Sequence, residues 1–137
     1  MAEIIEKRET DEFGNTIQLV YNDGVLHKRI TYNKKGDMVE EFYPGELRTC
    51  YKYNDNGDEI ECNQYLIYEN QYEEHARCEF KKYDAEGRII ECEGEDIADG
   101  PFRFTYKYEP FEGKVLQKIY DKNGDLVGVG IVETQYL

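Results

Sequence analysis

Two histidines and four cysteines are the residues of this 137-residue chain that most readily do nucleophilic or acid–base chemistry. His75 precedes Cys78 by three positions, so the pair could supply a general base and a thiol nucleophile. Neither residue has nearby the glycine-rich elbow or oxyanion loop that usually accompanies such a nucleophile. His27 lies within a predicted strand, beside charged residues. We therefore predict no catalytic residues and no enzymatic activity.

Five carboxylates between positions 91 and 99 form an acidic cluster that could hold Ca²⁺: Glu91, Glu93, Glu95, Asp96 and Asp99. The calcium-loop pattern Asp-x-Asp-x-Asp-Gly is absent there. Residues 54–58 imitate the centre of that loop, but no glutamate follows at its twelfth position. No glycine loop for phosphate is present either. We therefore predict no metal and no cofactor.

The four cysteines, Cys50, Cys62, Cys78 and Cys92, contain no Cys-x-x-Cys pair that would indicate zinc. A cross-strand Cys50–Cys62 disulfide is conceivable, depending on loop length, because a slip of one residue sends a side chain to the other face. Residues 1–6 lack the basic region and apolar core of a signal peptide. Unless a leader has been removed, we expect a cytoplasmic protein whose thiols are free and packed as small core residues.

A repeated turn must position any functional side chains. Its pattern is Tyr, Asn or Asp, two polar residues, Gly and a further polar residue, at 32–37, 53–58, 83–88 and 120–125. Asn and Asp start turns by bonding their own backbone, and the glycine accepts the positive φ of a short hairpin loop. The repeat glycines are Gly36, Gly57, Gly87 and Gly124. A turn recurs about every ten residues, which is typical of a β-meander.

Aromatic and β-branched residues flank these turns and predict strands over 3–9, 16–21, 25–32, 38–43, 59–69, 102–108, 115–120 and 126–132. Residues 72–77 break the rhythm; a helical turn would fit this segment, but we expect a second long strand pair there. The predicted fold is one all-β domain over residues 1–137, an antiparallel meander of about ten to twelve strands. A twisted single sheet and a partly closed barrel or sandwich both fit this pattern.

The register around the repeat turn at residues 54–57 can be predicted from favourable cross-strand pairs. A four-residue loop would place Tyr51 opposite Ile60. It would also place Lys52 opposite Glu59. An aromatic beside a β-branched residue and a pair of opposite charges both stabilise neighbouring strands.

Residues 83–89, Tyr-Asp-Ala-Glu-Gly-Arg-Ile, resemble the tyrosine–aspartate repeats of bacterial Rhs-type proteins. The looser form, an aromatic residue followed by Asn-Gly, is similar to the short antiparallel repeats of MORN-like proteins. The chain departs from the first family by its small size and by Asp37, Asp58 and Asp125 where arginine is usual. The resemblance implies a β-shell or spacer without catalytic residues.

Acidic residues outnumber basic ones by 30 to 17, which gives a net charge of −13. Such a surface repels nucleic acid and anionic membranes and attracts basic proteins. Acidity alone also keeps a repetitive β-protein soluble and its edges apart. We expect no nucleic-acid or membrane partner, and a basic protein or a carbohydrate as the alternatives.

The expected function is that of a non-enzymatic protein-interaction module. A small acidic protein resembling Rhs-type repeats suggests, as its sharpest form, an immunity protein that neutralises a basic toxin. A carbohydrate-binding domain and a structural scaffold are the alternatives. Exposed tyrosines and carboxylates would make the contacts in either binding role. The predicted binding residues are Tyr51, Tyr53, Tyr106, Tyr108, Glu91, Glu93, Glu95 and Asp96.

Overall fold

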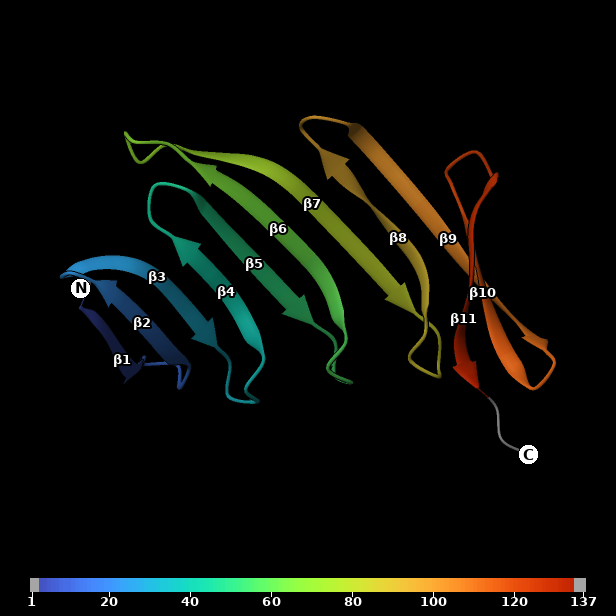
Figure 1. Cartoon of the computed structure of the whole chain (residues 1–137), viewed down its shortest axis with the longest axis horizontal. Coiled ribbons are helices and arrows are strands. Elements are labelled where there is room, and N and C mark those ends of the chain that lie inside the picture. The colour runs from blue at the N-terminus through green and yellow to red at the C-terminus, as the bar shows by residue number, and fades with distance from the viewer. Residues whose placement is uncertain (1–2, 135–137) are drawn as a thin grey trace. The chain divides into compact units, whose positions relative to one another are not determined.

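A computed structural model describes residues 3–134 and confirms the all-β fold, since these residues form eleven strands and no helix (Figure 1). None of the described segments is therefore a helix that could cross a membrane. The strands are β1 Ile4–Thr10, β2 Thr16–Asn22, β3 Val25–Tyr32, β4 Met38–Tyr43, β5 Leu47–Tyr53, β6 Glu59–Ile67, β7 Glu73–Tyr83, β8 Ile89–Asp96, β9 Gly100–Phe111, β10 Lys114–Tyr120 and β11 Leu126–Thr134.

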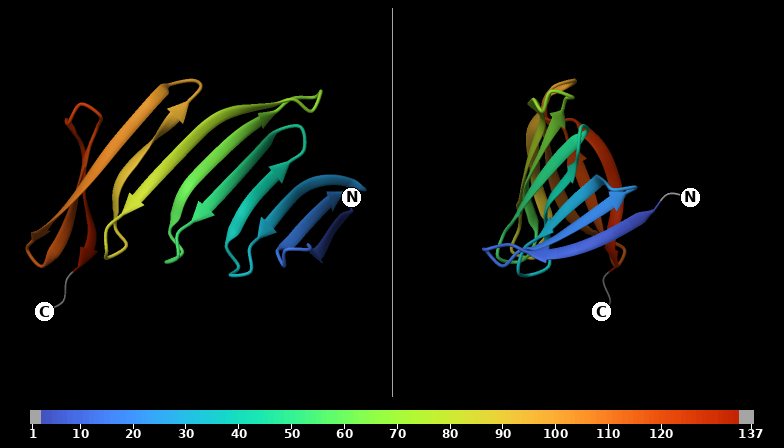
Figure 2. Two further views of the ribbon diagram at one scale, coloured as in Figure 1. Left: turned by 180° about the vertical axis from the view of Figure 1, so that it is seen from behind. Right: turned by 90° about the vertical axis from the view of Figure 1, so that its left-hand side faces the viewer.

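All eleven strands follow one another in a single antiparallel meander sheet, with β1 and β11 at the two ends of the strand order. Of the two architectures that fit the sequence, the single sheet is the one observed. The chain divides into two compact units after Cys78, within β7. Figure 2 shows the strands of each unit lying side by side. The single domain predicted over residues 1–137 stays a prediction.

The repeat turns share one hydrogen-bond pattern, which explains why the sequence pattern recurs. In the turn after β5, the Asn54 amide donates to the Asp58 carbonyl at 2.9 Å, and the Gly57 amide donates to the Asn54 carbonyl at 3.0 Å. The Asn54 side-chain oxygen accepts from the amides of Asn56 and Asp58. Gly57 has φ of 87°, which a residue with a Cβ rarely adopts. The same bonds close the turns at residues 11–15, 33–37, 84–88 and 121–125.

The register predicted at this turn is wrong by two residues. Tyr51 lies opposite Cys62, and Lys52 lies opposite Glu61. The loop holds five residues, because Asn54 pairs with Asp58 across it, and a bulge between Lys52 and Tyr53 adds a further offset. Side chains alternate between the two faces of a sheet, so a shift of two residues keeps the side chains in the regular part of β5 on the same face as their predicted neighbours.

The expected second long strand pair over the irregular segment is confirmed, because β6 and β7 are consecutive and neighbouring strands in the sheet. A copy of the repeat turn joins them. Tyr68 donates its amide to the Tyr72 carbonyl at 2.9 Å, and Gln71 donates to the Tyr68 carbonyl at 2.9 Å. Gln71 takes the glycine position with φ of 68°. The sequence pattern missed this turn because it contains neither the first Asx residue nor the glycine.

The core is thin. Among the described residues only Ile30, Thr49, Ile67, Cys92 and Val115 are buried, and no side chain is less than 2% exposed. A single sheet has no second layer to cover either face, so most side chains pack only against their neighbours across the strands. Both faces of each unit therefore remain available to a partner.

Candidate interaction site

An open groove of about 590 Å³ lies in the first unit, beside the repeat turns that close β1–β2, β3–β4 and β5–β6. These three turns fall at the same end of the unit, because each follows an odd-numbered strand of the meander (Figure 1). Tyr51 and Tyr53, two of the predicted binding residues, line the groove. Its other walls are Phe13, Asn15, Asn33, Lys34, Lys35, Asp37, Val39, Lys52, Asn54, Asp55 and Ile60.

Both tyrosines are held by their hydroxyl groups. Tyr51 donates to the Glu41 carboxylate at 2.8 Å, and Tyr53 donates to the Met38 carbonyl at 2.5 Å. Burial raises the pKa of both phenols, and the hydrogen bond to Glu41 adds to the rise at Tyr51. The two tyrosines are therefore fixed and neutral. Because their hydroxyl groups already donate hydrogen bonds, they contribute mainly aromatic ring surface to the groove.

The polar lining of the groove carries charges of both signs. The lining residues include the cations Lys34, Lys35 and Lys52 and the anions Asp37 and Asp55. A lining of this kind can bond the hydroxyls of a sugar or the peptide groups of a protein loop.

Gly14 allows the close approach that places one of these lysines. A Cβ at Gly14 would lie 2.5 Å from Cε of Lys34, so a larger residue there would make the flexible end of that lysine move aside. Lys34 also lines an adjoining hollow of about 380 Å³, together with Arg8 and Tyr32. The two hollows thus share a lysine and the turns at residues 11–15 and 33–37.

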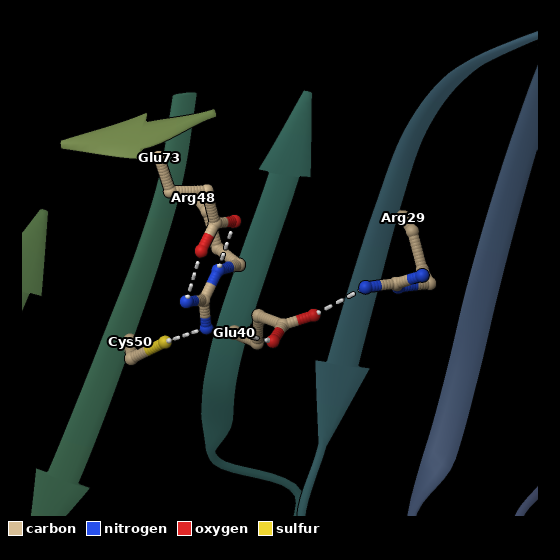
Figure 3. Close-up of polar contacts among 5 residues, drawn as sticks. All are labelled: Arg29, Glu40, Arg48, Cys50 and Glu73. Carbon is tan, nitrogen blue, oxygen red and sulfur yellow. Dashed lines mark hydrogen bonds and ion pairs between the residues drawn. The ribbon is translucent and has the colours of Figure 1, made fainter. Parts of the chain in front are cut away.

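A polar network crosses one face of the first unit and includes side chains from β3, β4, β5 and β7 (Figure 3). Glu40 receives a hydrogen bond from Arg29 at 2.9 Å and lies 3.8 Å from Arg48. Arg48 also donates two hydrogen bonds to the Glu73 carboxylate, at 3.0 and 2.9 Å. This two-point contact spans β6, because Arg48 belongs to β5 and Glu73 to β7.

Aromatic rings extend this network. Arg29 lies over the Phe42 ring at 4.5 Å from its centroid, and Arg48 lies over the Tyr65 ring at 4.4 Å. His75 stacks on the same Tyr65 ring, with 4.8 Å between the two ring centroids. Arginine and tyrosine are the residue types that most often dominate protein–protein interfaces. We call the set Arg29, Glu40, Phe42, Arg48, Tyr65, Glu73 and His75 the arginine–aromatic row.

Arg48 affects the ionisation of two neighbouring groups, the carboxylate of Glu73 and the thiol of Cys50. The hydrogen bond from Arg48 holds the pKa of Glu73 below its usual range. Cys50 accepts a contact from Arg48 at 3.3 Å, but burial outweighs that charge and raises the pKa of the thiol. Cys50 is thus poorly suited to act as a thiolate nucleophile at neutral pH. His75 contacts the Asn63 side chain at 2.9 Å.

None of the four cysteines forms a disulfide, but only Cys92 is buried, so the expected packing as core residues is confirmed for Cys92 and wrong for the half-buried Cys50, Cys62 and Cys78. The alternative Cys50–Cys62 disulfide is excluded, because Cys50 lies opposite Asn63 and Cys62 lies opposite Tyr51. This register puts the two thiols on opposite faces of the sheet.

The other two predicted binding tyrosines lie on β9 of the second unit. Tyr108 donates its hydroxyl hydrogen to the Ile89 carbonyl at 2.6 Å and accepts a bond from Gln117 at 3.0 Å. Arg88 lies over the Tyr108 ring at 4.7 Å from its centroid. Burial raises the pKa of Tyr106. Both rings are therefore part of the packed surface of this unit.

The predicted acidic binding residues do not converge on one point. Glu91, Glu93 and Glu95 alternate along one face of β8, and Glu91 pairs with Arg103 at 2.7 Å. That contact lowers the pKa of Glu91. Asp96 instead accepts a hydrogen bond from the Ala98 amide at 2.8 Å, within the following turn. Over residues 3–132, no three histidine, cysteine or acidic side chains are grouped to hold a metal ion.

Sequence reasoning found two residues of the groove but missed the arginine–aromatic row. Arg48 and Glu73 are 25 positions apart and meet only across an intervening strand. No protein-family model matches the chain. No curated protein matches it either. The likeness to tyrosine–aspartate and MORN-like repeats therefore stays a resemblance.

Proposed function

We propose that this protein is a non-enzymatic protein-interaction module that binds a basic protein partner. The observation that carries the proposal is the arginine–aromatic row, a pre-organised set of interface-type side chains on one face of a thin sheet. Ion pairs and stacking already hold these side chains in place, so less conformational entropy is lost when a partner covers them. The exposed sheet faces supply the surrounding contact area.

The net charge of −13 sets the chemistry of the partner. Long-range attraction speeds the encounter with a basic protein, and the aromatic rings then make the short-range contacts. In its sharpest form the proposal is a cytoplasmic immunity protein that covers the phosphate-binding surface of a basic toxin. That form rests on charge and on the resemblance to Rhs-type repeats.

The test is capture of partners from the lysate of the native host at low and high salt, followed by titration of the purified partner. We expect one basic protein whose dissociation constant rises as salt is raised to about 0.5 M, where screening acts within about 3–5 Å. Arg29→Ala should weaken the complex. Arg103→Ala, which removes an ion-paired arginine outside the row, is the control. Affinity that is unchanged by salt and by Arg29→Ala would contradict the proposal.

A second candidate function, carbohydrate binding, is favoured by the groove. Fixed Tyr51 and Tyr53 rings beside amide and carboxylate groups are the chemistry that stacks on and hydrogen-bonds a sugar. A glycan array tests it, and a hit should be lost in Tyr53→Ala and retained in Arg29→Ala. If neither a protein nor a glycan binds, a structural scaffold becomes the better description.

A further inference from the structure

The two end strands of the sheet are chemically unlike. β1 carries Glu6, Lys7, Arg8 and Glu9 among its seven residues. Charged side chains on an end strand discourage other strands from pairing with it. β11 is the other end of the strand order, and residues 126–132 within it contain no charged side chain. One end of the sheet is thus protected and the other is not.

A short regular stretch of β11 lies between two irregularities in its pairing. Its pairing with β10 has irregularities between Val115 and Leu116 and between Ile119 and Tyr120. Between these points residues 128–131 pair with β10 in unbroken register, so their outward N–H and C=O groups alternate regularly. No other described strand pairs with this outer side.

The two faces of this segment differ sharply. Val129 and Ile131 share one face and are each 56% exposed. Gly128 and Gly130 occupy the opposite face. A Cβ at Gly130 would meet no atom within 4 Å, whereas a Cβ at Gly128 would lie 3.3 Å from the Ile119 side chain. An added strand would therefore cover an aliphatic pair on one face and find room for long side chains beside Gly130 on the other.

We infer that the outer edge of β11 is the docking site for an extended, basic segment of the partner protein, which adds as a further strand. This inference rests on the proposed function and specifies its surface. Main-chain hydrogen bonds from residues 126–132 would hold the segment, and its aliphatic side chains would extend the contact of Val129 and Ile131. Its lysines and arginines would extend over the glycine face.

Charge complementarity selects this occupant over a second copy of the chain. Two copies joined at β11 would each bring a net charge of −13, and their repulsion opposes the contact. A cationic segment is attracted by the same field. An extended backbone is required because the groups left unpaired on an end strand are peptide N–H and C=O groups.

The probe is a peptide of alternating lysine and valine, as long as β11 at nine residues. Its control has the same sequence with alternate backbone amides methylated, so that it keeps its charge but cannot pair. We expect the first peptide to bind and to slow hydrogen exchange of the amides at 126–132, and the methylated peptide to do neither. Val129→Lys should weaken binding about tenfold or more, because it opposes the charge of the peptide and removes an aliphatic contact. Ile4→Lys, the same change on exposed β1, should leave binding intact.

Peptide binding without new protection at 126–132, or equal binding by Val129→Lys, would overturn the assignment of this edge. Absence of peptide binding would overturn it as well. Binding of the host partner tests the protein-interaction proposal separately. If that partner bound the wild type and Val129→Lys equally, the proposed function would stand and only the assignment of this edge would fail. If sedimentation showed that the wild type self-associates and that Val129→Lys does not, the occupant of this edge would be a second copy of the chain and not a basic segment. Circular dichroism establishes that both variants are folded.

Discussion

Gln71 is the residue whose backbone conformation departs most clearly from its chemistry. It occupies the glycine position of a repeat turn with φ of 68°, where a Cβ is crowded. Gln71→Gly should raise the free energy of unfolding by about 0.5–1 kcal/mol, since relief of the crowding exceeds the extra freedom that glycine gives the unfolded chain.

Gly57→Ala is the control, because it makes the reverse change and removes a glycine from the same position of another repeat turn. Gly57 has φ of 87° and open space around it, so any loss of stability there comes from backbone conformation and not from a clash. We expect a loss of about 1 kcal/mol. Urea unfolding followed by circular dichroism measures both variants. A destabilised Gln71→Gly protein would show that the glutamine side chain has a stabilising contact of its own.

The contact between Arg48 and Glu73 makes stability depend on pH. Because the hydrogen bond lowers the pKa of Glu73 in the folded state, its contribution is fully present above the unfolded pKa and disappears as pH falls through the folded one. We expect the midpoint temperature of thermal unfolding to fall between about pH 5 and pH 3, and to fall more steeply for the wild type than for Glu73→Gln. Glu74→Gln, one position along β7, should retain the wild-type slope. Parallel curves for wild type and Glu73→Gln would contradict the role assigned to this pair.

At the scale of elements, the Asx turn is the unit that the chain reuses. The side-chain oxygens of Asn33 and Asn54 each accept from two backbone amides, at 3.0 and 3.0 Å and at 3.0 and 2.9 Å. Asn33→Ala and Asn54→Ala should therefore lower stability by similar amounts, about 1 kcal/mol each. Thermal unfolding compares them. A difference of more than about twofold would show that the strands beside the turn, and not the turn itself, decide the loss.

The same turns explain how far the fold could be predicted from sequence. Asx and glycine bond only to residues within five positions, so the hairpins, their spacing and the all-β meander follow from local chemistry. The register around Gly57 does not, because a bulge beside Tyr53 adds an offset that no local pattern specifies. The turn at Tyr68–Tyr72 escaped prediction since Gln71 adopts a glycine conformation without being glycine.

The candidate site depends on the assembly of several strands, which limits its prediction further. Tyr51 and Tyr53 could be named because tyrosines beside a repeat turn are visible in the sequence. The arginine–aromatic row could not, because Arg29, Arg48 and Glu73 meet only once β3 to β7 are placed in register. Contacts of this kind follow from cross-strand neighbours, and an error of one residue in register would replace every member.

At the scale of the whole molecule, the thin meander should unfold in parts. In the contacts described, each strand packs against its neighbours in the chain, as in repeat proteins. Val115 in the second unit is 3% exposed and Ile30 in the first is 8% exposed. Val115→Ala should lower local stability by about 2 kcal/mol, and Ile30→Ala by about 3 kcal/mol.

Hydrogen exchange distinguishes local from global unfolding in these two variants. Val115→Ala should speed exchange of the amides of β9 to β11 and leave β2 to β5 near the wild-type rates, while Ile30→Ala should do the reverse. This reciprocity follows because stability in a strand array is a sum of nearest-neighbour terms, so a cavity is felt mainly by the strands that line it. If either substitution accelerated exchange equally in both units, the sheet would unfold as one cooperative body, and the single domain predicted from the sequence would be the better description.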